Sequence, residues 1–188
     1  MRSPWGGWSG GFRETATMRP GPGEVLHFSE DPTITRFVPH VAATARQPEA
    51  YVWAVDHDTA PAYWFPRDCP RALAWPRADT TAEDRAWLGP RRVHAVEYAW
   101  LRRVQHVTLY AYRFDASAFR PFGDAAHVAT EPVDPLGPPE PVGDLLDLHE
   151  DAGIELRVLP ELWPFWHEVT RRTLGFSGIR LRNARPPR

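Results

Sequence analysis

The sequence predicts an α+β domain with mixed, largely antiparallel sheets and short flanking helices. Two observations lead to this fold class. Strand-length apolar runs and helix-like segments with clear start and stop residues are mixed along the chain, without the strict strand–helix alternation typical of a parallel sheet. With 188 residues, of which 43% are hydrophobic, the chain also has the length and apolar content of one domain.

Three parts are expected along the chain. Residues 1–23 form a flexible leader rich in Gly and Pro, residues 24–182 form the single α+β domain, and residues 183–188 form a tail. The leader lacks the apolar core of a signal peptide, and no apolar run approaches the roughly 18 residues that span a bilayer. We therefore expect a cytoplasmic protein with no membrane partner.

The first half of the domain contains three runs with the length and composition of strands, namely residues 24–28, 51–55 and 71–75. Asp58 and Thr59 are good N-cap residues, and Pro66 should end the helix that they begin after roughly two turns. Residues 80–83 (TTAE) match a capping box, and Gly89 should end the helix that follows.

The second half continues the mixture. Strands are predicted at residues 93–98, 106–114, 126–130, 154–159 and 178–182, and helices at residues 143–152 and 161–174. Residues 106–114 alternate cleanly between two faces. Five prolines between residues 132 and 141 exclude a central strand or a helix there, so this segment should cross the surface as extended chain.

Composition excludes several functions. The net charge of -2 argues against a broadly basic nucleic-acid binder, and the absence of Lys excludes Schiff-base catalysis. Cys69, the only cysteine, rules out an intrachain disulfide and is expected to be a small buried thiol, since no neighbour supplies a base. His94, His106 and His127 lack metal-ligand spacing, so no metal is expected.

Two polar clusters mark a candidate site, residues 27–31 (HFSED) and residues 66–71 (PRDCPR). His27, at a strand end, either donates to a ligand or bonds a nearby backbone carbonyl. Arg67 either binds a phosphate or carboxylate through two hydrogen bonds or braces the turn by pairing with Asp68, and Arg71 could pair with Asp68 in the same way.

The roles of two further residues, Ser29 and Glu131, also have alternatives. Ser29 is more typical of a turn than of a catalytic group. Glu131 follows a predicted strand, where its carboxylate either faces a cleft or is solvated at a loop entrance.

Three segments together resemble the ADP-ribosyltransferase superfamily. Residues 26–29 (LHFS) look like its first motif, and residues 51–56 (YVWAVD), followed by Ala60 and Tyr63, are similar to its second. Residues 126–133 (AHVATEPV) look like the closing segment of the rifampin-modifying members. The chain also resembles a family of uncharacterised bacterial proteins that share the HFSED, WFPRDCPR and GFSGIRLRN blocks, over residues 25–185.

The superfamily resemblance implies an ADP-ribosyltransferase-like fold that uses NAD as a substrate and needs no metal. Glu131 and His27 would be catalytic, Glu131 by stabilising an oxocarbenium-like state. The NAD contacts would come from His27, Ser29, Trp53, Tyr63 and Arg67. Trp53 or Tyr63 would stack on nicotinamide, and Arg67 would bind the pyrophosphate. The product would be ADP-ribose on an unknown acceptor or, with water, hydrolysed NAD.

Two other classes of function are considered. The same scaffold could be a non-catalytic ligand- or protein-binding domain, which is favoured if Glu131 or His27 points away from the cleft. Single-stranded nucleic-acid binding would need aromatic side chains interleaved with basic ones on an open face. The net charge and the helical spacing of Trp163 and Trp166, typical of a core, argue against it.

Overall fold

The structure is a computed structural model that describes residues 18–41, 49–123 and 126–187. These residues form strands, α-helices and 3-10 helices in mixed order, which confirms the α+β class. Most of the predicted leader, residues 1–17, lies outside the described residues, as does much of the segment between residues 40 and 50. Met18 is already part of the main core cluster.

The strands form three small sheets. The first contains β1 (Glu24–Ser29), β5 (Tyr110–Asp115) and β8 (Glu140–Pro141). The second contains β10 (Gly175–Ile179), β3 (Arg71–Trp75), β4 (Val93–Glu97) and β9 (Glu155–Leu159). The third contains β2 (Val52–Ala54), β7 (Ala126–Ala129) and β6 (Arg120–Phe122). All pairs are antiparallel except β4 with β9.

Four α-helices flank these sheets in the described chain, α1 (Ala82–Leu88), α2 (Tyr98–His106), α3 (Leu145–Asp151) and α4 (Leu162–Thr170). Three 3-10 helices connect them, η1 (Ala60–Tyr63), η2 (Ala116–Ala118) and η3 (Leu181–Asn183). No helix of the described residues is long and apolar enough to cross a membrane.

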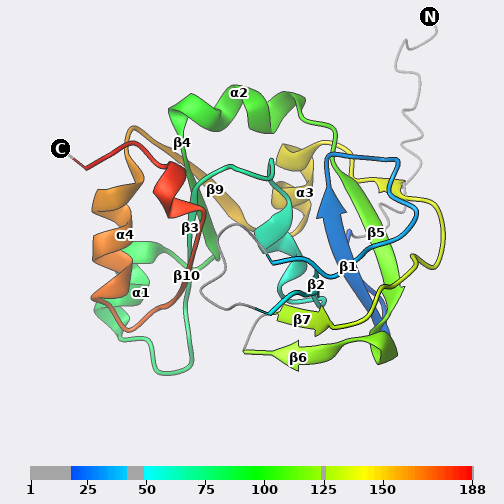
Figure 1. Cartoon of the computed structure of the whole chain (residues 1–188). Coiled ribbons are helices and arrows are strands. Elements are labelled where there is room, and N and C mark those ends of the chain that lie inside the picture. Colours follow the sequence, from blue (N-terminus) through cyan, green and yellow to red (C-terminus); the bar gives the residue numbers. More distant parts are fainter. Residues whose placement is uncertain (1–17, 42–48, 124–125, 188) are drawn as a thin grey trace, which may run out of the picture.

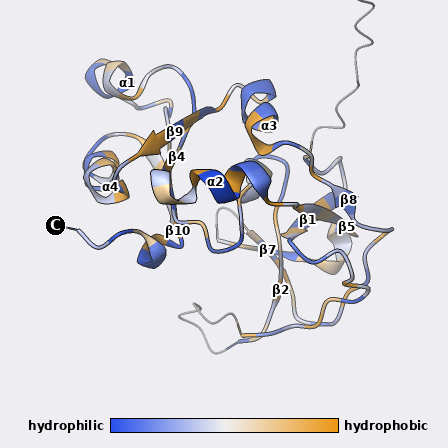
Figure 2. Ribbon diagram, turned by 90° about the horizontal axis from the view of Figure 1, so that it is seen from above, coloured by the Kyte–Doolittle hydropathy of each residue, from blue (hydrophilic) through white to orange (hydrophobic). Residues whose placement is uncertain are grey.

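The second sheet has helices on both of its sides. Helices α1 and α4 cover one side of it, and α3 lies on the other, beyond β9 (Figures 1 and 2). Strand β4 is buried along its whole length, because Val93 and Ala95 join the core under α1 and α4 whereas Val96 joins the main core. A third core cluster lies on the far face of the β1 and β2 strands.

Three expectations need correction. The helix expected after Asp58 is only the four-residue η1, which has a proline in its first turn and is followed by Pro66. The last strand spans Gly175–Ile179, and the chain then turns into η3 instead of continuing to residue 182. Helix α2 was not predicted, although Trp100, Leu101 and Val104 in its sequence have helical spacing.

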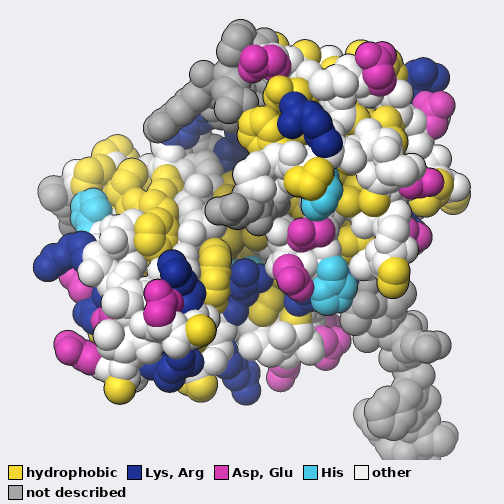
Figure 3. All heavy atoms as spheres, turned by 90° about the horizontal axis from the view of Figure 1, so that it is seen from below, with side chains coloured by type: hydrophobic (Ala, Val, Ile, Leu, Met, Phe, Trp, Pro, Cys, Tyr) yellow, Lys and Arg dark blue, Asp and Glu magenta, His cyan; other side chains and the backbone are white. Residues whose placement is uncertain are grey.

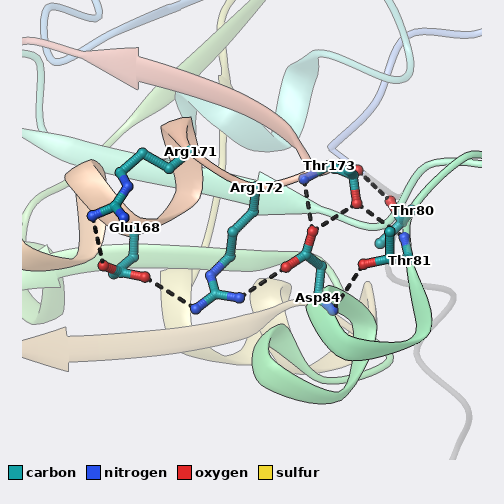
Figure 4. A network of polar contacts seen from close by, with 7 residues as sticks. All are labelled: Thr80, Thr81, Asp84, Glu168, Arg171, Arg172 and Thr173. Atoms are coloured by element: carbon teal, nitrogen blue, oxygen red, sulfur yellow. Dashed lines mark hydrogen bonds and ion pairs between the residues drawn. The ribbon is translucent and has the colours of Figure 1, made fainter.

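A polar network attaches α1 to the turn after α4 (Figure 4). The capping box at residues 80–83 made Thr80 the expected N-cap, but the helix is capped one residue later, by Thr81, whose hydroxyl accepts from the Asp84 backbone N–H at 3.2 Å. The Asp84 carboxylate accepts from Arg172 Nη1 at 2.8 Å and from the Thr173 N–H and hydroxyl at 2.8 and 2.7 Å. These hydrogen bonds hold the pKa of Asp84 well below its usual range.

The surface opposite α2 carries basic, acidic and hydrophobic side chains close together (Figure 3). Neither sign of charge forms a continuous patch on the face seen there.

Candidate functional site

Three segments that are far apart in the sequence meet at the turn formed by residues 66–70. The backbone N–H of Arg67 donates to Glu30 Oε1 at 2.9 Å, which joins this turn to the end of β1. The Asn183 side-chain amide donates to the carbonyl of Asp68 at 2.8 Å, which joins the turn to η3. Arg103 of α2 adds an ion pair to Glu30 at 3.1 Å. The HFSED, WFPRDCPR and GFSGIRLRN blocks are therefore one contiguous region.

His27 lies on β1 with its ring against the third core cluster. Nδ1 is 2.7 Å from the carbonyl oxygen of Trp53, and the ring packs on Phe37 with the centroids 5.0 Å apart. Burial lowers the pKa of His27, the bond to the carbonyl opposes this, and the charges of Arg67 and His40 lower it further. A neutral ring that donates from Nδ1 leaves a lone pair on Nε2. Of the two alternatives considered from the sequence, the bond to a backbone carbonyl is therefore the one that is observed.

Ser29 and Arg67 take different places at the same end of β1. The Ser29 hydroxyl is buried and accepts from the Asp31 N–H at 3.1 Å, which confirms its role in the turn. The Arg67 side chain is exposed. Within the described residues neither Arg67 nor Arg71 forms an ion pair with Asp68, so the bracing pair considered from the sequence is not observed.

The two candidate stacking rings do not lie beside the His27 ring. Trp53 packs edge-on against Tyr51 and Phe122, with ring centroids 5.8 and 5.2 Å away. Its side chain lies on the face of β2 opposite Ala54, which belongs to the third core cluster. Tyr63 lies with its ring 5.5 Å from Cζ of Arg71. Trp53 therefore faces the other side of the sheet from His27, and Tyr63 lies next to Arg71.

Glu131 is exposed two residues after β7 and has no hydrogen bond or ion pair to any described residue. The strand pairings place it at the edge where β1 ends. Leu26 is bridged to Val55, and β2 pairs antiparallel with β7, so the ends of β1 and β7 lie at the same edge. Phe37, whose ring packs on His27, is also bridged to Val133. The segment that follows Glu131 is thus linked to His27 through Phe37.

Arg71 was considered from the sequence only as a possible partner of Asp68, and its burial was not predicted. It is only 3% exposed, and it donates from Nε to the Ala62 carbonyl at 2.7 Å and from Nη1 to the Cys69 carbonyl at 2.9 Å. Burial lowers the pKa of Arg71 to about 10. The sequence shows a charged residue at the start of a strand, and only packing between β3 and η1 shows that its guanidinium is buried.

Cys69 is fully buried beside Arg71, as expected. Burial raises the pKa of its thiol to about 12, with smaller opposing contributions from Arg71 and Arg103. At neutral pH the thiol is therefore protonated, and it has no role as a nucleophile in this conformation.

A second buried polar pair joins β4 to α3. His94 is 0% and His149 1% exposed, with His94 Nδ1 3.1 Å from His149 Nε2. His149 Nδ1 donates to the Leu145 carbonyl at 2.6 Å, so its Nε2 accepts from His94, and the lone pair of His94 Nε2 has no partner in the described chain. No group of three or more candidate metal ligands occurs among the described residues.

Two shallow hollows flank α2. One of about 380 Å³ is lined by Glu30, Arg103, His106, Val107 and Thr108, next to the 66–70 turn. The other, of about 470 Å³, lies at the start of α2, where the buried carboxylate of Glu97 accepts from the Leu162 and Arg185 backbone N–H groups. His94 and Glu97 face opposite sides of β4, as their spacing predicts.

Comparison with known proteins assigns the region to a family. A family model described as a family of unknown function (DUF6886) matches residues 26–184, and the chain belongs to this family. This match agrees with the resemblance of residues 25–185 to uncharacterised bacterial proteins. No curated protein and no solved structure matches the chain. The matched range includes β1, the 66–70 turn and η3.

Proposed function

We propose that this protein binds NAD at the shared edge of β1, β2 and β7, and transfers ADP-ribose to an acceptor or hydrolyses NAD. The observation that carries the proposal is the adjacency of the three motif strands. Leu26 is bridged to Val55, and Trp53 pairs with Val128. Segments that are remote in the sequence are thus brought to one place, as a three-motif NAD site requires.

The chemistry assigns distinct roles to the residues at this edge. Breaking the bond between nicotinamide and the ribose C1′ develops positive charge on the ribose, and a carboxylate stabilises that charge. Glu131 is an exposed carboxylate at the end of β7, and His27 offers Nε2 to a ribose hydroxyl. Arg67, an exposed cation whose charge lowers the pKa of His27, would attract the pyrophosphate.

The test is the release of nicotinamide, followed by proton NMR of NAD mixed with the purified protein. We expect release by the parent protein and its loss in Glu131→Gln and His27→Gln. The matched control is Glu83→Gln, which removes an exposed carboxylate from the first turn of α1, away from this edge. Loss of release in Glu83→Gln as well, or no change in Glu131→Gln, would contradict the assignment.

A second candidate is a non-catalytic binding domain on the same scaffold. It is favoured by the placement of Trp53, which faces the other side of the sheet from His27, and of Tyr63, which lies next to Arg71. Broadening of NAD resonances without nicotinamide release would support this candidate. Neither broadening nor release would eliminate NAD as the ligand.

A further inference from the structure

Strand β10 forms one edge of the second sheet, and β9 forms the opposite edge (Figure 2). Because β10 pairs only with β3, alternate residues point their backbone N–H and C=O groups away from the sheet. Within the described chain, residues 175–179 take part in no backbone hydrogen bonds apart from those of this pairing. The outward-pointing groups of β10 are therefore available to another strand.

The other sheet edges of the described chain are protected against such pairing. Strands β6 and β8 each contain a proline, Pro121 and Pro141, which has no N–H to donate. Strand β9 carries the charged pair Glu155 and Arg157 and is contacted by α2 and α3. The edges formed by β1 and β2 are joined to each other by a bridge. Strand β10, with the sequence GFSGI, contains neither a charged residue nor a proline.

The surface beside this open edge is apolar on the face that α4 covers. Phe176 is 44% exposed, although its ring packs edge-on against Trp166 with the centroids 5.6 Å apart. Trp166 and Leu181 are half-buried, and their side chains leave no room for a Cβ on Gly178. A large exposed aromatic ring beside an unprotected strand edge is typical of an interface.

The sequence of β10 is complementary to itself in an antiparallel pair. With Ser177 on a two-fold axis, Phe176 of one copy lies opposite Gly178 of the other, and Ile179 lies opposite Gly175. Each bulky side chain thus faces a glycine on the same face of the sheet. The two neighbouring registers would pair Phe176 with itself or Gly178 with itself, and both would leave strand residues unpaired.

Helix α4 leaves room for this pairing. It contacts β3 and the strands on both sides of β3, so two copies joined through β10 would hold their α4 helices about 14 Å apart, which is three strand spacings. Packed helices need only about 8–10 Å between their axes, so the Phe176 rings fit between them. After β10 the chain turns back across the ends of β3 and β4, where Asn183 bonds the Asp68 carbonyl and the Arg185 N–H bonds Glu97.

We propose that two copies of this protein associate through β10, in an antiparallel pair centred on Ser177 that joins their four-stranded sheets into one. A second copy is the partner because each bulky residue of β10 meets a glycine only when β10 pairs with its own sequence in this register. The interface belongs to a different sheet from the edge formed by β1, β2 and β7. The proposal therefore does not depend on NAD being a substrate, and it is tested without NAD.

Sedimentation velocity of the full chain over a concentration series measures the association. We expect a dimer that dissociates on dilution, and we expect Phe176→Lys to be monomeric where the parent is dimeric, because a charge on an edge strand opposes pairing. The matched control is Leu136→Lys, which changes another exposed apolar side chain, away from β10, and should associate like the parent. Circular dichroism checks that both variants are folded. A parent that is monomeric at every concentration, or a Phe176→Lys variant that dimerises like the parent, would overturn the proposal.

Substitutions at position 177 test the register. Because the two Ser177 residues lie directly opposite each other, Ser177→Arg and Ser177→Asp should each be monomeric, and an equimolar mixture of the two should dimerise. Residues directly opposite in an antiparallel pair have Cα atoms about 4.5–5.5 Å apart, which suits a disulfide.

Ser177→Cys should therefore form a covalent dimer on mild oxidation, as seen on a non-reducing gel, and the native Cys69 is buried and does not compete. Ser117→Cys, a change at an exposed serine of η2, is the control and should stay monomeric. Equal cross-linking of the two variants, or a charge mixture that does not associate, would exclude this pairing.

Discussion

Residues in and next to the 66–70 turn differ sharply in how deeply their side chains are buried. Arg67 contributes its backbone N–H to Glu30 and leaves its side chain exposed, whereas Arg71 is buried against η1. Cys69, between them, is covered completely. The prolines that bracket the turn fix its backbone, but the neighbours contributed by β1, α2 and η3 decide which side chain is buried.

The thiol of Cys69 should be unreactive in the folded protein. Because burial raises its pKa to about 12, the thiol keeps its proton at pH 8, and the side chain is also inaccessible. We expect iodoacetamide to label the native protein very slowly and the urea-unfolded protein rapidly, as followed by mass spectrometry. Equal labelling rates in the two states would show that the thiol is exposed.

At the scale of elements, local sequence signals predicted most strands and helices near their observed positions. Two local signals were displaced by a few residues: α1 is capped by Thr81, one residue after the start of the capping box, and the segment predicted as a strand from residue 106 forms β5 only from Tyr110. Helix α2 was missed because Tyr98 and Trp100 are weak helix formers and because residues 93–98 were predicted as a single strand that included Tyr98. Tyr98 instead begins the helix. The two-residue strand β8 confirms that the proline-rich segment supplies only a sheet edge.

The pairing of β10 with β3 depends on a small residue at position 175. Gly175 pairs with Trp75, and a Cβ there would collide with the indole of Trp75, over which Arg92 lies at 4.5 Å. We expect Gly175→Ala to lower the free energy of unfolding by about 1–3 kcal/mol, measured by urea denaturation. Gly137→Ala is the control, because an added Cβ there meets no atom within 4 Å. Equal stability of the two variants would contradict this packing.

For the whole molecule, sequence patterns did not predict how the strands and helices assemble. The three sheets and the parallel pairing of β4 with β9 depend on contacts between residues that are far apart in the chain. The His94–His149 pair is another such contact, since it joins the second sheet to α3 across the main core. Nothing in the spacing of these two histidines indicates that they touch.

This pair should make the stability of the fold sensitive to acid. Burial lowers the pKa of both histidines, and the charge of Arg71 lowers both further, as His149 also does for His94. The unfolded chain takes up these protons as the pH falls through about 6.5, whereas the folded protein does not. The contribution to stability is therefore full above that pH and is lost below it. The free energy of unfolding should fall by up to about 1.4 kcal/mol per pH unit for each histidine that stays neutral.

Urea denaturation between pH 7.5 and 5 measures this dependence. The double variant His94→Phe/His149→Phe should show a flatter profile, whereas His106→Gln, a change at an exposed histidine, should follow the parent. Histidine NMR of the parent gives an independent readout, with no titration of His149 expected near pH 6.5. A normal titration there, or a parent-like slope in the double variant, would exclude the pair as the cause.

The sequence by itself determined the α+β class, the approximate positions of most elements and the buried thiol. These properties depend on residues within a few positions of one another, whose propensities and periodicity can be read locally. Only the tertiary structure decided that Arg71 is buried without a counter-ion, that Trp53 faces away from His27 and that His94 meets His149. Burial and electrostatic environment are set by neighbours from other elements, and one sequence does not state which elements will be neighbours.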